Sequence, residues 1–489
     1  MSLKGEIRVS SDKSISHRSI MLASLAKGKT KISNFLFAED TLHTILAFLK
    51  LGAKIQIFYR DKEISLKDTF SLLKINPLSL ERETYIVVEG LNKNISEPDD
   101  VLYLGNSGTT TRLLAGILAG GVKYSVLTGD ASLRNRPMKR IKIPLESMGA
   151  KVYLRKDNYL PMTIIGKNLK GISYKSPVAS AQVKSCILLA GLFTKDKIKV
   201  IEPVKSRDHT ERLLRFLEVS IKEDPKIEDK VFIEIYKNKD VEKYFEIINQ
   251  IFSKENKVCL GEKRNLISDK EIFIPADISS AAFFIVGALL IEGSKITLKD
   301  VLLNPTRTGI IDVLLKMNAD ISFDNVRVEN GEIVGDLKVR YTPNLKPIEI
   351  RGSLIPRLID EIPILSLLMI FAKGKSKVKD AKELRVKESD RISLICENLK
   401  KFGVNIEEFE DGFEVEGLSK EDILKNIENK KIFIQTFLDH RIAMTFKILE
   451  KVLNKKFEFE NEDCIKTSFP SFNYYLDILE NSGGEKNNE

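Results

Sequence analysis

Cationic, hydroxyl and carboxylate side chains gather in short loops that precede runs of apolar residues along this chain. Lys13, Ser14 and Arg18 stand in the first such loop, and Gly108 and Arg112 in the second. Free backbone N–H groups at the start of a helix, with cations beside them, bind phosphate and carboxylate groups, and glycine lets an anion approach the backbone closely. The two loops therefore indicate anion sites, although ordinary hydroxyl caps with solvated charges would have the same residue types.

The next loops continue this pattern toward the middle of the chain. Arg136 lies among four cations in seven residues, beside a proline that favours a turn over an exposed helix. Ser180 and Gln182 open the third apolar run with hydroxyl and amide donors. Ser206 and Arg207 precede another helix, where a capping box is an equally good explanation. Taken alone, each of these loops is weak evidence for a ligand.

Carboxylates join the cations in the second half of the chain. Asp360 is distinctive because catalysis at a hydroxyl group needs a base near all those cations. Glu388 lies in a loop that carries both charge signs and would also serve as a helix start with an ion pair. The cations of these later loops are Lys387, Arg391, Arg441 and Lys466. Together the loops predict a small, multiply anionic ligand whose phosphate and carboxylate groups are held by arginine forks.

Six similar sequence units must position these loops. Each begins with an apolar run typical of a helix buried on every side, continues with a stretch that alternates like a half-buried strand, and includes an amphipathic second helix. The runs begin near Ser19, Arg112, Cys186, Phe283, Pro363 and Arg441. Their starts are roughly 75 to 95 residues apart, well beyond solenoid periods, so each unit is a subdomain. The pattern predicts an α/β protein with two domains of three units each.

The length of the chain agrees with this organisation. A chain of 489 residues is too long for one ordinary core. The Lys-, Glu- and Asn-rich segment 219–270 interrupts the rhythm of the units, and we expect a surface elaboration of the third unit without a role in chemistry. The tail 481–489 is predicted to be disordered.

Charge and cysteine usage narrow the class of protein. The net charge of +9 is modest and spread along the chain, so it favours anionic ligands only weakly. The four cysteines stand singly, without metal-binding spacing, which favours a reducing compartment and predicts no metal site. No signal peptide opens the chain, and no apolar run reaches membrane-spanning length. We therefore expect a cytoplasmic protein without a membrane partner.

Several of these loops, taken together and in order, resemble those of a known family. They are residues 12–18, 105–112, 136–137, 385–391 and 439–441, together with Lys466. They are similar to the signature loops of the 5-enolpyruvylshikimate-3-phosphate synthases, or 3-phosphoshikimate 1-carboxyvinyltransferases. The match runs in order from Lys4 to about Leu479, except for the charged segment 219–270. The resemblance implies the inside-out α/β barrel fold of the enolpyruvyl transferases, in which each domain packs three βαβαββ units around buried helices.

The resemblance also implies domain boundaries and an activity. Residues 13–274 would form the N-terminal domain, and residues 1–12 with 275–480 the C-terminal domain, joined by two crossovers. The enzyme would transfer the enolpyruvyl group of phosphoenolpyruvate to the 5-hydroxyl of shikimate 3-phosphate and release phosphate, through a tetrahedral addition–elimination intermediate and without metal or cofactor. This step of the shikimate pathway leads to chorismate and aromatic amino acids. We expect a monomer that binds no nucleic acid.

By the same resemblance, the site residues fall into three overlapping groups. The catalytic residues would be Lys13, Asp360 and Glu388. Shikimate 3-phosphate would be bound by Lys13, Ser14, Arg18, Ser180, Gln182, Ser206, Arg207, Asp360 and Lys387. Phosphoenolpyruvate would be bound by Lys13, Gly108, Arg112, Arg136, Gln182, Arg391, Arg441 and Lys466. Which of the three catalytic residues acts as acid or base at each step stays open.

Ala181 departs from the family pattern, since many members have a second serine at this position. One hydroxyl donor to the phosphate of shikimate 3-phosphate is therefore missing. Arg207 or Lys184 could compensate for it.

Two other functions compete with this one. The sister enzyme that transfers enolpyruvyl to UDP-N-acetylglucosamine has the same six-unit plan but uses a cysteine in the loop after its second helix, and residues 113–150 contain none. A basic nucleic-acid-binding protein would agree with the net charge, but such proteins usually interleave aromatic residues for base stacking. Among the aromatic residues, these loops contain only Phe469 and Phe472, and the chain has no tryptophan.

Overall fold

The computed structural model of the chain describes residues 2–166 and 168–482. All six apolar runs form helices in which nearly every residue is buried. These are α1 (Lys13–Leu25), α5 (Gly108–Gly121), α7 (Ala181–Gly191), α11 (Ile278–Leu290), α14 (Ile362–Phe371) and α17 (His440–Leu453). The prediction of six helices with apolar residues nearly all round is therefore confirmed.

A second helix follows the buried helix of each unit. These helices are α2 (Glu39–Lys50), α6 (Lys139–Ser147), α8 (His209–Phe216), α12 (Gly309–Lys316), α15 (Arg391–Lys400) and α18 (Phe472–Asn481). Several contact a strand of their own unit, as α6 and α15 do, with polar residues on the opposite side. The predicted alternation of a buried and an amphipathic helix holds in every unit.

Three sheets belong to the N-terminal half of the molecule. Their strand orders are β14-β2-β5-β3-β4, β6-β7-β9-β8 and β10-β11-β13-β12, and in each the first pair is parallel and the others antiparallel. The strands are β2 (Lys29–Ser33), β3 (Lys54–Tyr59), β4 (Lys62–Ile64), β5 (Thr84–Glu89), β6 (Leu102–Tyr103), β7 (Tyr124–Thr128), β8 (Lys151–Arg155), β9 (Tyr159–Ile165), β10 (Ile172–Lys175), β11 (Ile198–Glu202), β12 (Ile221–Asp224), β13 (Asn256–Leu260) and β14 (Lys270–Phe273).

The C-terminal half repeats this plan in two sheets and shortens it in the third. The orders are β1-β15-β17-β16, β18-β19-β21-β20 and β22-β23. The strands are β1 (Lys4–Ile7), β15 (Lys295–Leu302), β16 (Ile321–Glu329), β17 (Glu332–Arg340), β18 (Glu349–Ile350), β19 (Lys375–Val378), β20 (Ile406–Phe409), β21 (Gly412–Glu416), β22 (Phe433–Ile434) and β23 (Glu458–Phe459). Within residues 2–166 and 168–482 the sixth unit has no closing pair of strands, so the expectation of six complete βαβαββ units is wrong there.

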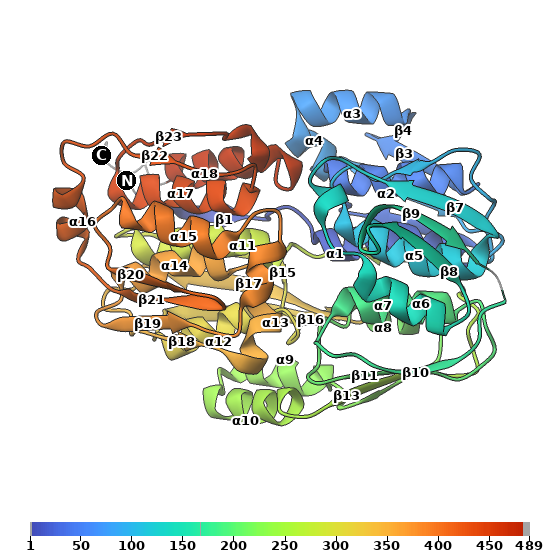
Figure 1. Cartoon of the computed structure of the whole chain (residues 1–489). Coiled ribbons are helices and arrows are strands. Elements are labelled where there is room, and N and C mark those ends of the chain that lie inside the picture. Colours follow the sequence, from blue (N-terminus) through green and yellow to red (C-terminus); the bar gives the residue numbers. More distant parts are fainter. Residues whose placement is uncertain (1, 167, 483–489) are drawn as a thin grey trace.

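The chain passes between the halves twice. Strand β1 pairs with β15 in the C-terminal half, as the resemblance implied, and β14 pairs with β2 in the N-terminal half. The two crossing segments lie side by side, since Ser11 and Ala276 form a β-bridge. Figure 1 shows the halves next to each other, with β1 lying among the orange and red elements of the C-terminal half.

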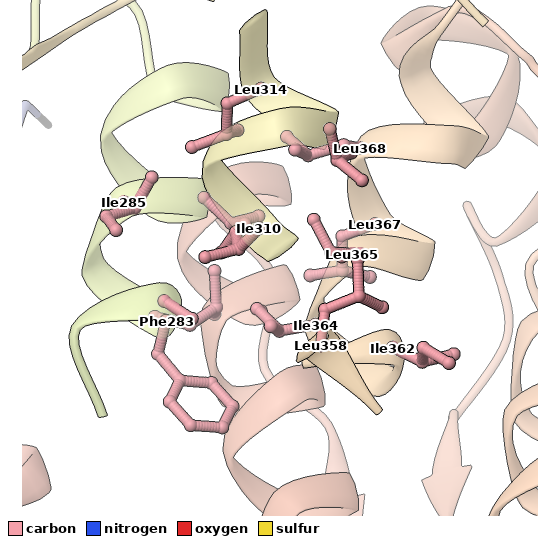
Figure 2. Packing of buried hydrophobic residues seen from close by; sticks show 14 of the residues in the cluster. Phe283, Ile285, Ile310, Leu314, Leu358, Ile362, Ile364, Leu365, Leu367 and Leu368 are labelled. Carbon is pink, nitrogen blue, oxygen red and sulfur yellow. The ribbon is translucent and has the colours of Figure 1, made fainter. Parts of the chain in front are cut away.

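Each half has its own hydrophobic core. One cluster consists of residues between Ile15 and Ile274 together with Leu302, and the other is formed mainly by residues from Ala276 to Leu479. In the second cluster, Phe283 of α11, Ile310 of α12 and Leu365 of α14 belong to one core (Figure 2). The two cores agree with a two-domain fold, while the boundaries 13–274 and 275–480 stay a prediction.

The charged segment 219–270 differs from the expectation of a surface elaboration. Its strands β12 and β13 are regular members of the third sheet. Only the connection between them is extra: a hairpin of helices α9 (Asp229–Asn238) and α10 (Val241–Phe252), which lies below α12 and α13 (Ile355–Leu358) in Figure 1. The apolar residues of the hairpin belong to the core of the C-terminal half. They recur at helical spacing between Lys, Glu and Asn residues, which made the segment look like solvated surface.

Two further details complete the fold. The first unit carries additional helices α3 (Leu66–Ile75) and α4 (Pro77–Arg82) between its strands. Helix α18 runs through Asn481, so the predicted disordered tail 481–489 begins too early, and 483–489 lie outside the described residues. Of the helices that the structure describes, none is both long and apolar enough to cross a membrane.

Candidate active site

A cleft of about 550 Å³ lies between the halves and is lined by residues of both. Most of the predicted site residues meet there. They are Lys13, Ser14, Gly108, Arg112, Arg136, Ser180, Gln182, Ser206, Arg207, Asp360, Lys387, Glu388, Arg391 and Arg441. Of the predicted residues, Arg18 and Lys466 lie elsewhere.

The buried helices bring these residues together because several of them begin at the cleft. Lys13, Gly108 and Arg441 stand in the first turns of α1, α5 and α17, and all three line the cleft. Asp12 caps α1 by accepting the Ile15 N–H at 2.8 Å, and similar side-chain caps precede α5 and α17. The positive ends of these helix dipoles therefore lie around one cavity, where they favour anionic groups.

Two arginines surround the start of α5. A Cβ atom added to Gly108 would lie 3.2 Å from Arg112 NH1 and 3.4 Å from Arg136 NH1. Gln182 joins them, since its Oε1 accepts a hydrogen bond from Arg112 NH1 at 2.6 Å. Burial, together with the nearby positive charges of Arg140 and Arg136, lowers the pKa of Arg112 to about 9. An anion bound here would relieve this repulsion.

Hydroxyl groups form the neighbouring part of the same wall. Ser206 Oγ donates to Glu202 Oε1 at 2.6 Å, and the Ser180 N–H donates to the same oxygen at 3.1 Å. Lys184, which the sequence offered as a substitute for the missing serine at Ala181, is not available. Its Nζ is fully buried and lies 2.9 Å from Glu202 and 2.8 Å from Glu211. That part of the sequence interpretation is wrong.

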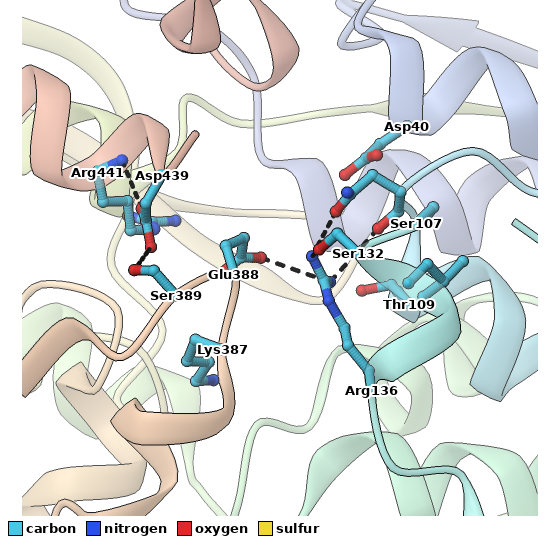
Figure 3. A network of polar contacts seen from close by, with 12 residues as sticks. Asp40, Ser107, Thr109, Ser132, Arg136, Lys387, Glu388, Ser389, Asp439 and Arg441 are labelled. Carbon is cyan, nitrogen blue, oxygen red and sulfur yellow. Dashed lines mark hydrogen bonds and ion pairs between the residues drawn. The ribbon is translucent and has the colours of Figure 1, made fainter. Parts of the chain in front are cut away.

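Arg391 organises the opposite wall. Its Nε and NH2 donate to Asp439 at 2.8 and 3.2 Å, and NH2 also donates to Glu388 Oε2 at 2.7 Å. Ser389 Oγ donates to the same aspartate at 2.9 Å, a contact that Figure 3 shows beside Arg441. Asp439 also caps α17, so one buried carboxylate fixes the loop, the arginine and the helix start together.

Ion pairs join the two walls across the cleft. Arg207 NH2 lies 2.5 Å from Asp360 Oδ2. Arg136 NH1 lies 3.6 Å from Glu388 Oε1, and a dashed line joins these two side chains in Figure 3. Arg207 and Arg136 come from the N-terminal half, and the two carboxylates from the C-terminal half. Each pair occupies charged groups that a ligand between the walls would engage instead.

The two carboxyl groups are held in their ionised forms. Burial alone would raise the pKa of Asp360, but the positive charges of Lys387, Arg207, Arg441 and Arg391 outweigh it and hold that pKa well below its ordinary value. Burial likewise opposes ionisation of Glu388. Cations, chiefly Arg391 and Arg136, again prevail and hold its pKa well below the ordinary value. Both groups are therefore negatively charged.

Arg18 and Lys466 are placed differently from the other predicted residues. The Arg18 guanidinium is buried and donates to Thr210 Oγ1 at 2.7 Å, Ser14 O at 2.9 Å and Ser185 Oγ at 3.1 Å. Lys466 is exposed, and its Nζ lies 2.6 Å from Asp463. Neither side chain is among those that line the cleft, since each has partners of its own, and the assignment of both to substrate binding stays a prediction.

The sequence did not single out several other residues of the cleft. Asp40 lies 3.1 Å from Lys13 Nζ, and Arg140 lies 3.2 Å from Glu383 across the cleft. Arg307 lies on the floor with 3% of its surface exposed and donates to Asp277 at 3.0 Å. The sequence offered one signal, since Arg307 precedes the second helix of unit four. The others look like ordinary helix-end or surface charges.

No three His, Cys, Asp or Glu side chains are arranged to hold a metal ion in the part of the chain that the structure describes. The polar groups of the cleft include arginine and lysine donors, hydroxyls, amides and several carboxylates, among them the ionised Asp360 and Glu388. Such a set of groups binds phosphate and carboxylate anions and can move protons.

Comparison with known proteins agrees with this chemistry. The sequence model of one family, described as EPSP synthase (3-phosphoshikimate 1-carboxyvinyltransferase), matches residues 1–69, 64–234 and 248–476. Residues 235–247, at the tip of the α9–α10 hairpin, lie outside the matched segments.

Individual relatives resemble the chain over nearly its whole length. A protein of Petrotoga mobilis named 3-phosphoshikimate 1-carboxyvinyltransferase is 43% identical, with 96% of this chain and 95% of the relative covered. A protein of the same name from Thermodesulfovibrio yellowstonii is 44% identical, with coverages of 98% and 97%. The solved structure of the EPSP synthase of Acinetobacter baumannii is 36% identical and superposes with a TM-score of 0.75, with 98% of this chain and 96% of that chain covered.

Proposed function

The chain belongs to the EPSP synthase family, and from this premise we propose how its cleft carries out the reaction of that family. The protein is a transferase that moves the enolpyruvyl group of phosphoenolpyruvate to the 5-hydroxyl of shikimate 3-phosphate and releases phosphate. The charge distribution of the cleft carries the proposal. Cations from both walls face one cavity, and Asp360 and Glu388, which we assign to catalysis, are each paired across it with an arginine.

Shikimate 3-phosphate would lie along the hydroxyl-rich part of the N-terminal wall. Ser180, Ser206 and Arg207 would hold its phosphate, and Ser14 its carboxylate. Arg18 would support Ser14 from beneath, because its NH1 already donates to the Ser14 carbonyl. The remaining contacts to this substrate would come from Lys13, Gln182, Asp360 and Lys387.

Phosphoenolpyruvate would lie between the start of α5 and the Arg391 loop. Arg112, Arg136 and Gly108 would surround its phosphate, assisted by Lys13 and Gln182. Its carboxylate would be gripped by Arg391 and Arg441 on the other wall. Lys466 would join this subsite only if its side chain left Asp463, its neighbour in the same short helical segment, and turned toward the cleft.

The reaction needs a proton removed from one substrate and a proton added to the other. Asp360 would take the proton of the 5-hydroxyl as the oxygen attacks C2 of phosphoenolpyruvate, while an acid protonates the methylene carbon. The tetrahedral intermediate would then lose a proton from the new methyl group and phosphate from C2, which restores the double bond. General acid–base help of this kind contributes about 10²–10⁴-fold to the rate, and alignment of two substrates in one cleft contributes further.

Glu388 and Lys13 are both candidates for the acid. Glu388 is ionised because Arg391 and Arg136 stabilise its charge. Phosphoenolpyruvate would bring negative charge to the same two arginines, so its binding would raise the pKa of Glu388 and let it take up a proton. The alternative donor is the amino group of Lys13, whose Nζ is oriented by Asp40 Oδ2 at 3.1 Å.

We also propose that the protein works as a monomer in the cytoplasm. Both walls of the cleft come from a single chain, so no second copy is needed to complete the site. Cys186, Cys259, Cys396 and Cys464 are free thiols, which suits a reducing compartment. Light scattering on the purified protein tests the first part: a mass near 55.4 kDa is expected, and twice that mass would refute the monomer.

Phosphate release from phosphoenolpyruvate tests the function, with shikimate 3-phosphate and UDP-N-acetylglucosamine compared as acceptors. We expect turnover with the first acceptor and none with the second. Turnover with the second alone would favour the sister activity, and no turnover with either would refute the proposal. Retention on a nucleic-acid column at physiological salt, without turnover, would instead favour the nucleic-acid-binding alternative.

A further inference from the structure

The α9–α10 hairpin connects two strands of the N-terminal half but packs in the core of the C-terminal half. It connects β12 to β13 in the third sheet of the N-terminal half, where a short turn would suffice. Its aromatic residues Phe232, Tyr236, Tyr244 and Phe252 are buried in the core of the C-terminal half. Residues 235–247 also lie outside the segments that match the family. Part of the hairpin thus lies outside the family match, while its apolar residues pack in the core of the other half.

A buried chain of polar contacts begins at this hairpin. Tyr244 OH donates to Asp312 Oδ1 of α12 at 2.7 Å. The same carboxylate accepts two hydrogen bonds from Arg357, at 2.5 and 2.9 Å. The Arg357 Nε donates to Pro305 O at 2.8 Å, and its Cζ lies 4.4 Å from the centre of the Phe252 ring. Every guanidinium nitrogen of Arg357 therefore has a partner, and the hairpin supplies one face of its surroundings.

Arg357 belongs to a segment that borders the cleft. It lies in α13, three residues before Asp360, and only 2% of it is exposed. Ile355, Pro356 and Ile359 from the same segment line the cleft, so this short stretch has one side on the cavity and the other on the hairpin. Fixing Arg357 fixes the backbone from which the Asp360 side chain projects.

We propose that the hairpin is a positioning element for Asp360, acting through Tyr244, Asp312 and Arg357. The proposal rests on the function proposed above, because that function gives Asp360 its role as base. The competing explanation is that the hairpin only covers apolar surface. The two differ in what the Tyr244 hydroxyl does: it orients the carboxylate that holds Arg357, and small displacements of a catalytic group have large effects on turnover.

A matched pair of variants separates these explanations. Tyr244→Phe removes the hydroxyl that contacts Asp312, and Tyr236→Phe removes an equally buried hydroxyl on the same hairpin that donates to Leu303 O at 3.4 Å. We expect Tyr244→Phe to lower kcat about 3- to 10-fold and Tyr236→Phe to leave it unchanged, with similar melting temperatures for both. Equal kcat values for the two variants would overturn the proposal.

A double-mutant cycle provides the second readout. If Tyr244 acts through Asp360, Tyr244→Phe should have no further effect on kcat once Asp360→Asn is present. The same fold loss in both backgrounds would show that the hydroxyl acts elsewhere and would overturn the proposal. Failure of the proposed function is distinguishable, since the wild-type enzyme would then show no turnover with shikimate 3-phosphate at all.

Discussion

Asp360 and Glu388 carry negative charge into a cleft that is otherwise rich in cations. Each pairs with an arginine from the opposite half, Asp360 with Arg207 and Glu388 with Arg136. The substrates would compete for the same arginines, so binding would release both carboxylates from their partners. A base and an acid would thereby become available only when the cleft is filled.

Replacement of Asp360 tests its role at the residue scale. Asp360→Ala should lower kcat by about 10²–10⁴-fold, because the 5-hydroxyl loses its base. The KM for shikimate 3-phosphate should change far less, since several other groups bind that substrate. Steady-state kinetics with both substrates measures the two effects. A variant that keeps its turnover would remove Asp360 from the mechanism.

Ala181 offers a gain-of-contact test at the same scale. It lines the cleft directly after Ser180, in the first turn of α7. Ala181→Ser adds a hydroxyl next to the proposed phosphate subsite, and one further hydrogen bond should lower the KM for shikimate 3-phosphate about 2- to 10-fold. The KM for phosphoenolpyruvate serves as the internal control and should stay the same. An unchanged KM for shikimate 3-phosphate would place its phosphate elsewhere.

At the scale of elements, α4 forms a second contact between the halves. Glu81 of α4 is buried and accepts a hydrogen bond from Ser10 at 2.8 Å, in the first crossing segment. Burial raises the pKa of its carboxyl to about 7, although the Ser10 hydrogen bond and Arg8 oppose the rise. The folded protein therefore binds this proton more strongly than the unfolded chain does.

The sign of the resulting pH effect follows from linkage. Proton binding by Glu81 stabilises the folded state. This stabilisation is fully present below the ordinary pKa of 4.5 and is lost as pH rises through about 7. Glutamine stays neutral at every pH, so Glu81→Gln should avoid the buried charge that forms at high pH. Its free energy of unfolding near pH 8 should exceed that of wild type by up to about 3 kcal/mol, with little gain near pH 5. Urea unfolding at both pH values measures it.

Glu83 provides the control for that measurement. It is exposed, and its hydrogen bond with Arg60 lowers its pKa to about 2. Glu83→Gln should therefore show no gain that grows with pH. If Glu81→Gln and Glu83→Gln behaved alike, the buried carboxyl of Glu81 would not be the source of the effect.

Some helices and site residues could be predicted from the sequence, and others could not. The six buried helices were predictable because a run such as 278–290 is apolar nearly all round. The α9–α10 hairpin was not, since amphipathic periodicity does not reveal which surface an apolar face covers. Loops at helix starts placed Lys13 and Gly108 correctly in the cleft, while Arg18 turned inward because three oxygen acceptors lie within its reach.

At the scale of the whole molecule, the cleft gathers cations from two domains around ligands that are themselves multiply anionic. Attraction of this kind is screened by salt. Raising NaCl from about 0.1 M to about 1 M, which shortens the screening length from roughly 10 Å to 3 Å, should raise the KM of both substrates and change kcat much less. Initial rates across this range provide the measurement. A KM that is independent of salt would contradict electrostatic capture by the cleft.

Deuterium transfer from solvent tests the central claim most directly. In D₂O, addition places a solvent deuteron on the methylene carbon of phosphoenolpyruvate, and elimination retains part of it in the vinyl group of the product. We predict deuterium in that vinyl group when shikimate 3-phosphate is present, measured by mass spectrometry, and none in phosphoenolpyruvate incubated with the enzyme alone. Release of phosphate with an undeuterated product would contradict transfer by addition and elimination in this cleft.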